Sequence, residues 1–480
     1  MNYRVVLNLL GKVLLIEAAF MALPILVALL YQESSWIYFL LPMLGAGMVG
    51  LLLSRLHVPT ESLYAKEGFV TVGLSWILLS MVGALPFFLS GQIPHYLDAV
   101  FEAVSGFTTT GASILADVET LDHCMLFWRS FTNWLGGMGV LVFMLAILPN
   151  ANGQSIHLLR AESPGPLVSK IMPKMRHSAG VLYLIYLAMT LVEIVLLLAG
   201  GMPLFDSLCA SFSTAGTGGF SIWNNSMNYY DSYYSQMVIA IFMALFGINF
   251  NVFFFLLICR PMTAIRSSEF RWYIAILLGA TAIVTFNTLS LYASTYDAFH
   301  HAFFTVSSIM TTTGFCTVNF DTWPELSRMI IIFLMFIGGC AGSTAGGLKV
   351  SRLVILVKQA LCELKRLVHP RTVNVLMVDH KRVPDETLHG VITYLLLYLF
   401  TIVFSILLIS LDDFSTTTTS TAVFSAINNV GPGLDLVGPI GNYSTFSYLS
   451  KFVLCVDMLL GRLELFPIVI MLLPSTWWRK

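Results

Sequence analysis

The sequence predicts an all-α polytopic membrane protein, and three observations support this prediction. Apolar residues make up 57% of the 480 residues and charged residues only 11%, and the mean hydropathy is +0.81. A soluble domain usually carries about 25% charged residues, so this chain lacks the charges that cover a water-facing surface. Ten apolar stretches reach the length of roughly 20 residues that a bilayer-spanning helix needs. Together these properties exclude a cytosolic enzyme, a secreted disulfide scaffold and a nucleic-acid-binding protein.

The ten expected spans form a two-helix hairpin followed by four longer units. They cover about 5–31, 36–54, 68–91, 124–148, 178–201, 233–259, 272–293, 326–357, 388–411 and 448–474. The first stretch contains Lys12, Glu17 and Pro24 and lacks a clear small-residue cleavage site. We therefore expect it to be a retained helix rather than a signal peptide.

Four segments between these spans are too short to cross a bilayer and too apolar to be ordinary loops. They are residues 95–123, 203–231, 296–324 and 413–446. Each begins with about a dozen helix-compatible residues and then breaks into Thr, Ser, Gly or Asn. Such a pattern predicts four re-entrant half-helices, each followed by an extended loop at membrane depth.

The basic residues give the chain an orientation, because cytoplasmic loops of membrane proteins are enriched in Lys and Arg. In the ten-helix arrangement all Lys and Arg residues lie on one side except Arg129, Arg328, Lys451 and Arg462. We expect this side to be cytoplasmic and to hold both termini. The four re-entrant segments lie on the opposite, acidic side. Acidic residues there favour cation entry, but the positive-inside rule alone would also leave them there.

The alternation of helix, half-helix, loop and helix occurs four times, which predicts a fourfold internal repeat around a pore. The expected divisions are 1–62 for the N-terminal hairpin, then 63–150, 151–265, 266–370 and 371–480 for the four repeats. The third repeat contains a broken helix. Asp98 precedes Gly111 by the same thirteen residues that separate Asp206 from Gly219, which supports this alignment.

The four loops are the candidate cation-binding site. Extended backbone is tolerated inside a bilayer only where protein buries it or water lines it, and rings of carbonyl oxygens can replace the hydration shell of a cation. Glycine lets the backbone aim these carbonyls inward, and Thr hydroxyls add oxygen ligands. The candidate residues are Thr109, Thr110, Gly111, Thr217, Gly218, Gly219, Thr312, Thr313, Gly314, Asn429, Val430 and Gly431. The fourth loop diverges most, since it has Asn and Val where the others have Thr or Gly.

A glycine-rich stretch interrupts the eighth span and is the candidate gate. Its residues of interest are Gly338, Gly339, Gly342, Ser343, Gly346, Gly347 and Lys349. Each Gly costs a helix about 1 kcal/mol relative to Ala, so this segment predicts a broken helix, a common device for a gate or binding site. Close helix packing through small residues is the alternative interpretation.

Arg462 lies within the last span, where a charge is costly and usually faces a cavity or a partner. One interpretation is a buried ion pair with Asp457, Glu464 or another helix. The other is a positive charge in the pore that forms an electrostatic barrier to cations.

The pattern resembles the Trk/Ktr/HKT superfamily of potassium transporters, and most closely its TrkH-type membrane subunit, over essentially the whole chain. The resemblance rests on the four loops, on Glu67-Gly68-Phe69, on residues 338–347 and on Gly461-Arg462-Leu463-Glu464. It implies K+ uptake across the bacterial plasma membrane through a filter with one glycine per repeat, Gly111, Gly219, Gly314 and Gly431. Relatives with Ser at the first position tend to pass Na+, whereas this chain has Gly at all four.

The resemblance also implies a homodimer and a separate cytoplasmic nucleotide-binding ring subunit, TrkA-like, for which the basic loops 150–177 and 358–386 are candidate docking surfaces. We expect K+ as the permeant ion and no cofactor bound by this chain. Passage of Na+ or of both ions, and ion-coupled symport, remain alternatives. An intramembrane enzyme would need clustered catalytic residues, and neither a His-Glu-x-x-His nor a Gly-x-Ser-x-Gly motif occurs.

Overall fold

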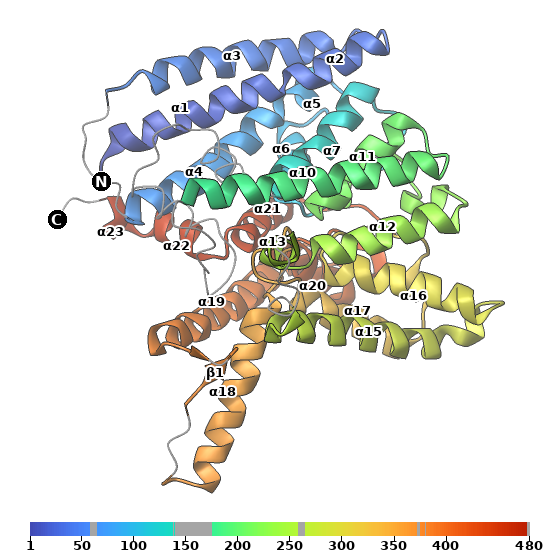
Figure 1. Cartoon of the computed structure of the whole chain (residues 1–480). Helices are drawn as coiled ribbons and strands as arrows, with labels where there is room; N and C mark the ends of the chain where they lie inside the picture. Colours follow the sequence, from blue (N-terminus) through green and yellow to red (C-terminus); the bar gives the residue numbers. More distant parts are fainter. Residues whose placement is uncertain are drawn as a thin grey trace.

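The computed structural model describes residues 1–57, 65–137, 139, 175–257, 265–371, 375–379 and 381–477, and these residues are almost entirely helical (Figure 1). The described strands are β1 (Met377–Val378) and β2 (Lys381–Arg382), which pair antiparallel. Part of the expected basic loop, residues 150–174, and the expected boundaries at 62/63 and 150/151 lie outside the described residues.

The N-terminal hairpin consists of α1 (Tyr3–Phe20), α2 (Ala22–Leu30) and α3 (Trp36–Ser54). Helices α1 and α3 pack closely because glycines face each other: a Cβ atom on either Gly11 or Gly50 would lie within 3.0 Å of the backbone of the other helix. The opposite face of α3 carries exposed Leu44, Met48 and Leu52. An all-apolar surface of this kind suits a helix that faces lipid.

The rest of the chain alternates long helices with short ones. The first two units contain α4 (Ala65–Gly83), α5 (Leu85–Leu89), α6 (Tyr96–Phe107) and α7 (His123–Gly137), then α10 (Met175–Ala199), α11 (Leu204–Gly216), α12 (Tyr233–Phe246) and α13 (Phe250–Leu257). The last two contain α15 (Ser268–Thr288), α16 (Thr295–Met310), α17 (Glu325–Ile337) and α18 (Val350–Val368), then α19 (Asp385–Ile409), α20 (Thr416–Asn428), α21 (Tyr448–Arg462), α22 (Phe466–Leu472) and α23 (Pro474–Trp477).

In the described parts of the chain, five single turns of 3-10 helix connect these elements: η1 (Ser226–Tyr229), η2 (Leu289–Leu291), η3 (Phe320–Thr322), η4 (Ser410–Asp412) and η5 (Asp435–Val437). The four expected half-helices are therefore α6, α11, α16 and α20.

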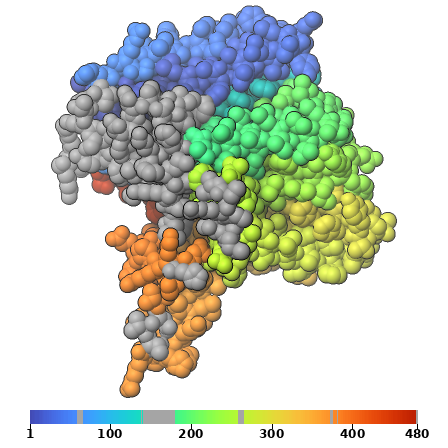
Figure 2. All heavy atoms as spheres, viewed as in Figure 1, coloured from blue at the N-terminus to red at the C-terminus, as the bar shows by residue number. Residues whose placement is uncertain are grey.

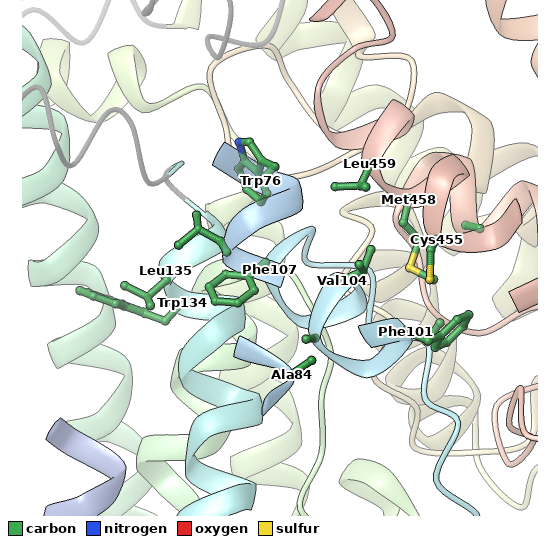
Figure 3. Close-up of a cluster of buried hydrophobic side chains, with 14 of the residues drawn as sticks. Trp76, Ala84, Phe101, Val104, Phe107, Trp134, Leu135, Cys455, Met458 and Leu459 are labelled. Carbon is green, nitrogen blue, oxygen red and sulfur yellow. The ribbon is translucent and has the colours of Figure 1, made fainter. Parts of the chain in front are cut away.

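The half-helices and the helices that follow them close into a ring. Helix α7 packs against α11, α12 against α16, α17 against α20, and α21 returns to pack against α6. Around α6, Figure 3 shows Phe107 directed toward α4 and α7, with Val104 facing Met458 of α21. The same buried hydrophobic cluster thus joins the first and the last units, which fixes the circular order of the four half-helices.

The described residues contain six helices long and apolar enough to cross a membrane, or seven if α12 and α13, which are bent by 93°, form one span. This is fewer than the ten expected spans, and the reasons are local. Helix α7 reaches the edge of the described residues at Gly137, and the eighth and tenth spans are each divided into two shorter helices.

The helices that follow the half-helices are interrupted at comparable positions. Residues 247–249 separate α12 from α13, residues 338–349 separate α17 from α18, and residues 463–465 separate α21 from α22. After the second break, α18 continues out of the helical body as a projection, visible at the bottom of Figures 1 and 2. Near the beginning of α18, Ile355 packs with Leu376, Val383 and Val391 in a small separate hydrophobic cluster.

Candidate functional site

Each half-helix ends in the same backbone turn. The residue two places before the predicted glycine has a left-handed conformation, with φ of 56° at Thr109, 55° at Thr217, 58° at Thr312 and 56° at Asn429. The next N–H group donates to the carbonyl of a serine five residues earlier: Thr110 to Ser105, Gly218 to Ser213 and Thr313 to Ser308 at 2.8 Å, and Val430 to Ser425 at 2.9 Å. Such bonds satisfy carbonyls that a helix end leaves without partners. The four turns are therefore equivalent although their sequences differ.

The predicted glycines themselves have φ of 80° at Gly111, 66° at Gly219, 89° at Gly314 and 99° at Gly431. Glycine adopts this region without the steric cost that a Cβ atom brings. Each glycine also lies against the next loop, because an added Cβ atom would come within 3.0 Å of a neighbouring carbonyl oxygen. The pairs are Gly111 with Gly218, Gly219 with Thr313, Gly314 with Val430, and Gly431 with Thr110.

These four contacts run in circular order and return to their start, so the structure brings all four loops together in a closed ring. We call the segments 108–111, 216–219, 311–314 and 428–431 hairpin loops 1 to 4. All twelve residues predicted for the site lie in this ring. We call Gly111, Gly219, Gly314 and Gly431 the ring glycines. The neighbouring carbonyl in each contact belongs to the residue immediately before one of them.

The carbonyl oxygens that precede the ring glycines have an unusual hydrogen-bonding state. Within the described part of the chain, no N–H or O–H group donates to the carbonyls of the two residues before each glycine: Thr109, Thr110, Thr217, Gly218, Thr312, Thr313, Asn429 and Val430. All eight residues are buried. Buried backbone carbonyls almost always have a partner, and a desolvated cation is the partner that a converging set of carbonyl oxygens can hold.

The side chain of Asn429 accounts for the divergence of hairpin loop 4. Its Nδ2 atom donates to the Thr110 hydroxyl and to the Met458 carbonyl, both at 2.9 Å. The amide thus ties hairpin loop 4 to hairpin loop 1 and to α21. We conclude that Asn429 replaces a threonine with a residue that braces the ring from one side.

The glycine-rich segment 338–349, the Gly-rich loop, lies between α17 and α18 and touches the ring. The N–H of Gly346 donates to the Thr312 hydroxyl at 2.6 Å, and a Cβ atom on Gly346 would collide with the Asn428 carbonyl. The loop therefore contacts hairpin loops 3 and 4 directly. Glycine is required at Gly346 because the two backbones approach too closely for a side chain.

The remaining candidate gate residues shape the Gly-rich loop. Gly338 and Gly347, with φ of 71° and 73°, lie against each other at its neck, where added Cβ atoms would meet the opposite backbone. Further along, the Ser343 hydroxyl donates to the Cys340 carbonyl at 2.6 Å, and Lys349 Nζ donates to the Ala345 carbonyl. Gly339 contacts Ala345, and Gly342 contacts the Asn249 side chain.

Arg462 joins the Gly-rich loop to the end of α7. Its Nη1 atom donates to the Thr344 carbonyl at 2.8 Å, and Nη2 donates to the Gly137 carbonyl at 2.7 Å and to the Gly136 carbonyl. The two acids expected as ion-pair partners have other contacts: Asp457 accepts from Ser405 at 2.8 Å, and Glu464 pairs with Arg352.

Two buried ion pairs hold α6 in place behind the ring. Arg129 of α7 pairs with Glu102 at 2.8 Å and also donates to the Ser221 carbonyl at 3.0 Å. Lys451 of α21 pairs with Asp98 at 2.8 Å. Four Lys and Arg residues lie apart from the expected cytoplasmic group. Three of them, Arg129, Lys451 and Arg462, thus make contacts around the ring.

Asp435 joins the loops that follow hairpin loops 3 and 4. Its carboxylate accepts from Ser415 at 2.5 Å and from Thr418 at 2.8 Å, and its N–H donates to Asp321 at 3.2 Å. These two hydroxyl donors stabilise the charged form and lower the pKa of Asp435 below its usual value. The carboxylate is therefore ionised at neutral pH and keeps a negative charge where these two loops meet.

A further regular signal, beyond those used for the predictions above, is the serine six residues before every ring glycine. Ser105, Ser213, Ser308 and Ser425 occupy this position and accept the equivalent bond in each turn. Aligning the segments on their glycines would have revealed it.

Comparison with known proteins gives a consistent assignment. The family model TrkH, a cation transport protein, matches residues 45–477. The Trk system potassium uptake protein TrkH of Salmonella typhimurium is 38% identical over 99% of this chain and 100% of its own length, and TrkG of Escherichia coli K12 is 32% identical over 100% and 99%. The crystal structure of the potassium transporter TrkH from Vibrio parahaemolyticus superposes with a TM-score of 0.90 at 34% identity and covers 100% of both chains. The chain therefore belongs to the TrkH family of cation transport proteins, and it is an all-α polytopic membrane protein.

Proposed function

We propose that this chain takes up K+ across the bacterial plasma membrane through a single pore whose selectivity filter is the ring of four hairpin loops. The observation that carries the proposal is the closed ring of buried carbonyl oxygens without donors among the described residues. Such oxygens can replace the water shell of an alkali cation. The names of the relatives, which are potassium uptake proteins, support K+ as the ion.

In this proposal the twelve ring residues form the K+-binding filter, with one glycine per repeat, and the domain division is the N-terminal hairpin plus four pore repeats. The carboxyl ends of the half-helices carry partial negative charge that favours a cation at the ring. Glycine at all four positions, as the sequence resemblance implies, favours K+ over Na+.

The Gly-rich loop is the proposed gate. It contacts hairpin loops 3 and 4 through Gly346, and Arg462 holds it by the Thr344 carbonyl. A loop in this position blocks the path below the ring when it stays in place. The positive charge of Arg462 also raises the energy of a cation that leaves the ring on this side.

Both termini and the projecting end of α18 lie on the cytoplasmic side in this proposal. The last turn of α18 carries Lys365 and Arg366, as the positive-inside rule requires, and exposes Leu364 and Leu367. Basic and apolar groups together suit a protein partner. We propose the same assembly that the resemblance implies, a homodimer that binds a TrkA-like nucleotide-binding ring.

The direct test is the reversal potential of the purified full-length protein in liposomes with K+ on one side and Na+ on the other. A potential near the K+ equilibrium value is expected. A value near zero would favour mixed Na+ and K+ passage, and a value that follows an imposed pH gradient would favour proton-coupled symport. Either result would overturn selective K+ passage as proposed.

Replacing Arg462 with Ala should raise K+ flux about tenfold, because hydrogen bonds from a charged donor contribute about 1.5–3 kcal/mol and each 1.36 kcal/mol is a factor of ten. The bonds to Thr344 and Gly137 hold the Gly-rich loop closed in this proposal. Flux of 86Rb+ into liposomes measures the effect. Arg462→Lys keeps the positive charge but has fewer hydrogen-bond donors. It therefore separates the effect of the electrostatic barrier on K+ flux from the effect of the hydrogen bonds. Unchanged flux with folded Arg462→Ala protein would contradict both roles.

A further inference from the structure

The carbonyl group of Gly431 differs from those of the other three ring glycines. It accepts hydrogen bonds from the Tyr443 hydroxyl at 2.9 Å and from the Ser425 hydroxyl at 2.6 Å. A carbonyl oxygen has two lone pairs, so both are occupied by protein donors. The carbonyls of Gly111, Gly219 and Gly314 accept no hydrogen bond from the described residues.

Burial shows the same asymmetry. Gly431 is buried, whereas Gly111, Gly219 and Gly314 are each partly exposed. Because Ser425 lies on α20 behind hairpin loop 4, a carbonyl bonded to its hydroxyl is turned toward α20 and away from the neighbouring loops. The ring thus has three glycine carbonyls without protein donors and one that is fixed at its back.

Tyr443 reaches this carbonyl from the outer loop between η5 and α21. Its side chain is 2% exposed, and its ring lies 5.6 Å from the rings of Phe101 and Phe446. Its own N–H donates to the Ser113 carbonyl at 2.9 Å, two residues after Gly111. Tyr443 therefore contacts the chain on both sides of the junction between hairpin loops 1 and 4.

We infer that Tyr443 is a specificity-determining residue, which holds the Gly431 carbonyl away from the ion path and fixes the spacing between hairpin loops 1 and 4. This inference rests on the proposed function, because it assigns a role within the filter. Tyr443 is a positioning residue, since its hydroxyl touches the backbone of the ring and not the ion.

The physical reason lies in how such a filter discriminates. Selectivity between K+ and Na+ depends on cavity size and on the number of coordinating carbonyl dipoles. If the Tyr443 hydroxyl is lost, one lone pair of the Gly431 carbonyl becomes free, and this oxygen can turn toward the path. A fourth mobile oxygen lets the site contract around the smaller Na+, so discrimination against Na+ falls.

The test compares Tyr443→Phe, which removes only the hydroxyl, with a matched control, Tyr96→Phe. The Tyr96 hydroxyl also donates to a backbone carbonyl, that of Met81 at 3.0 Å, but it lies outside the ring. Reversal potentials in opposing K+ and Na+ gradients give the Na+ to K+ permeability ratio. We expect this ratio to rise about threefold or more in Tyr443→Phe, as the typical net value of one hydrogen bond implies, and to stay unchanged in Tyr96→Phe.

The outcomes separate this inference from the proposed function. If the unaltered protein selects K+ and Tyr443→Phe has the same permeability ratio, the inference is wrong and the proposed function stands. If the unaltered protein does not select K+, the proposed function is wrong. A purely structural role would lower the amount of folded protein and leave the reversal potential unchanged. Should Tyr443→Phe fold poorly, Ser425→Ala removes the second donor to the same carbonyl and must shift the ratio in the same direction.

Discussion

Substituting Gly219 with Ala is expected to lower K+ uptake about a hundredfold, because the backbone there cannot accept a side chain. Gly219 has φ of 66°, a conformation whose strain costs a non-glycine residue about 1–3 kcal/mol, and each 1.36 kcal/mol is a factor of ten. The new Cβ atom would also collide with the Thr313 carbonyl. Relief of this collision must move hairpin loop 2 or 3 and displace oxygens of the ring.

Uptake of 86Rb+ by cells, normalised to the amount of protein in the membrane, measures this effect. Gly279→Ala is the matched control, because Gly279 lies in α15 with no atom within 4 Å of an added Cβ atom and Ala favours a helix. We expect normal uptake in the control. If Gly219→Ala protein is present in normal amounts and transports K+ normally, the ring of hairpin loops is not the ion path.

Deleting residues 341–345 is expected to raise K+ flux on the order of a hundredfold, because the deletion removes the bonds that hold the Gly-rich loop beneath the ring. The Thr344 carbonyl, which accepts from Arg462, is lost, as is the Ala345 carbonyl that accepts from Lys349. The bond from Gly346 to Thr312 loses the loop that positions it.

Flux into liposomes, compared with the unaltered protein at equal protein content, measures the result. Thermal unfolding in detergent verifies that the shortened chain is folded, and the reversal potential should remain that of K+ because the ring residues are intact. Equal flux in folded deletion protein would eliminate the gate role of the Gly-rich loop. A nonselective leak would indicate that the loop supports the ring rather than closing it.

Much of the architecture follows from the sequence because hydrophobic length and loop composition are local properties. The apolar stretches and the four half-helices could be located in this way, and each of α6, α11, α16 and α20 begins within three residues of the expected segment. The glycines of the hairpin loops could be identified because a positive φ and a close backbone approach both demand this residue type.

Other features depend on contacts between distant segments and left no local pattern. The break at Leu463, Glu464 and Leu465 contains no glycine or proline, and the latter two residues have φ of 54° and 66°. The partners of Arg462 are backbone carbonyls of residues more than 100 positions away. A sequence shows which nearby side chains are charged, but any residue can supply a carbonyl. Proximity in sequence therefore points to the acids Asp457 and Glu464 and not to distant carbonyls.

Tyr443 illustrates the same limit. A tyrosine in a connecting loop has many ordinary roles, and only the fold shows that its hydroxyl donates to the Gly431 carbonyl and its N–H to the Ser113 carbonyl.

The junction between α18 and the Gly-rich loop has a mechanical consequence. Helix α18 begins at Val350, directly after Lys349, and its 19 residues make a stiff rod about 28 Å long. A push of about 5 Å at the free end of such a rod tilts its base by roughly ten degrees. Lys349 is both the last residue of the Gly-rich loop and the residue before α18, so a tilt of α18 would also move the loop that contacts hairpin loops 3 and 4.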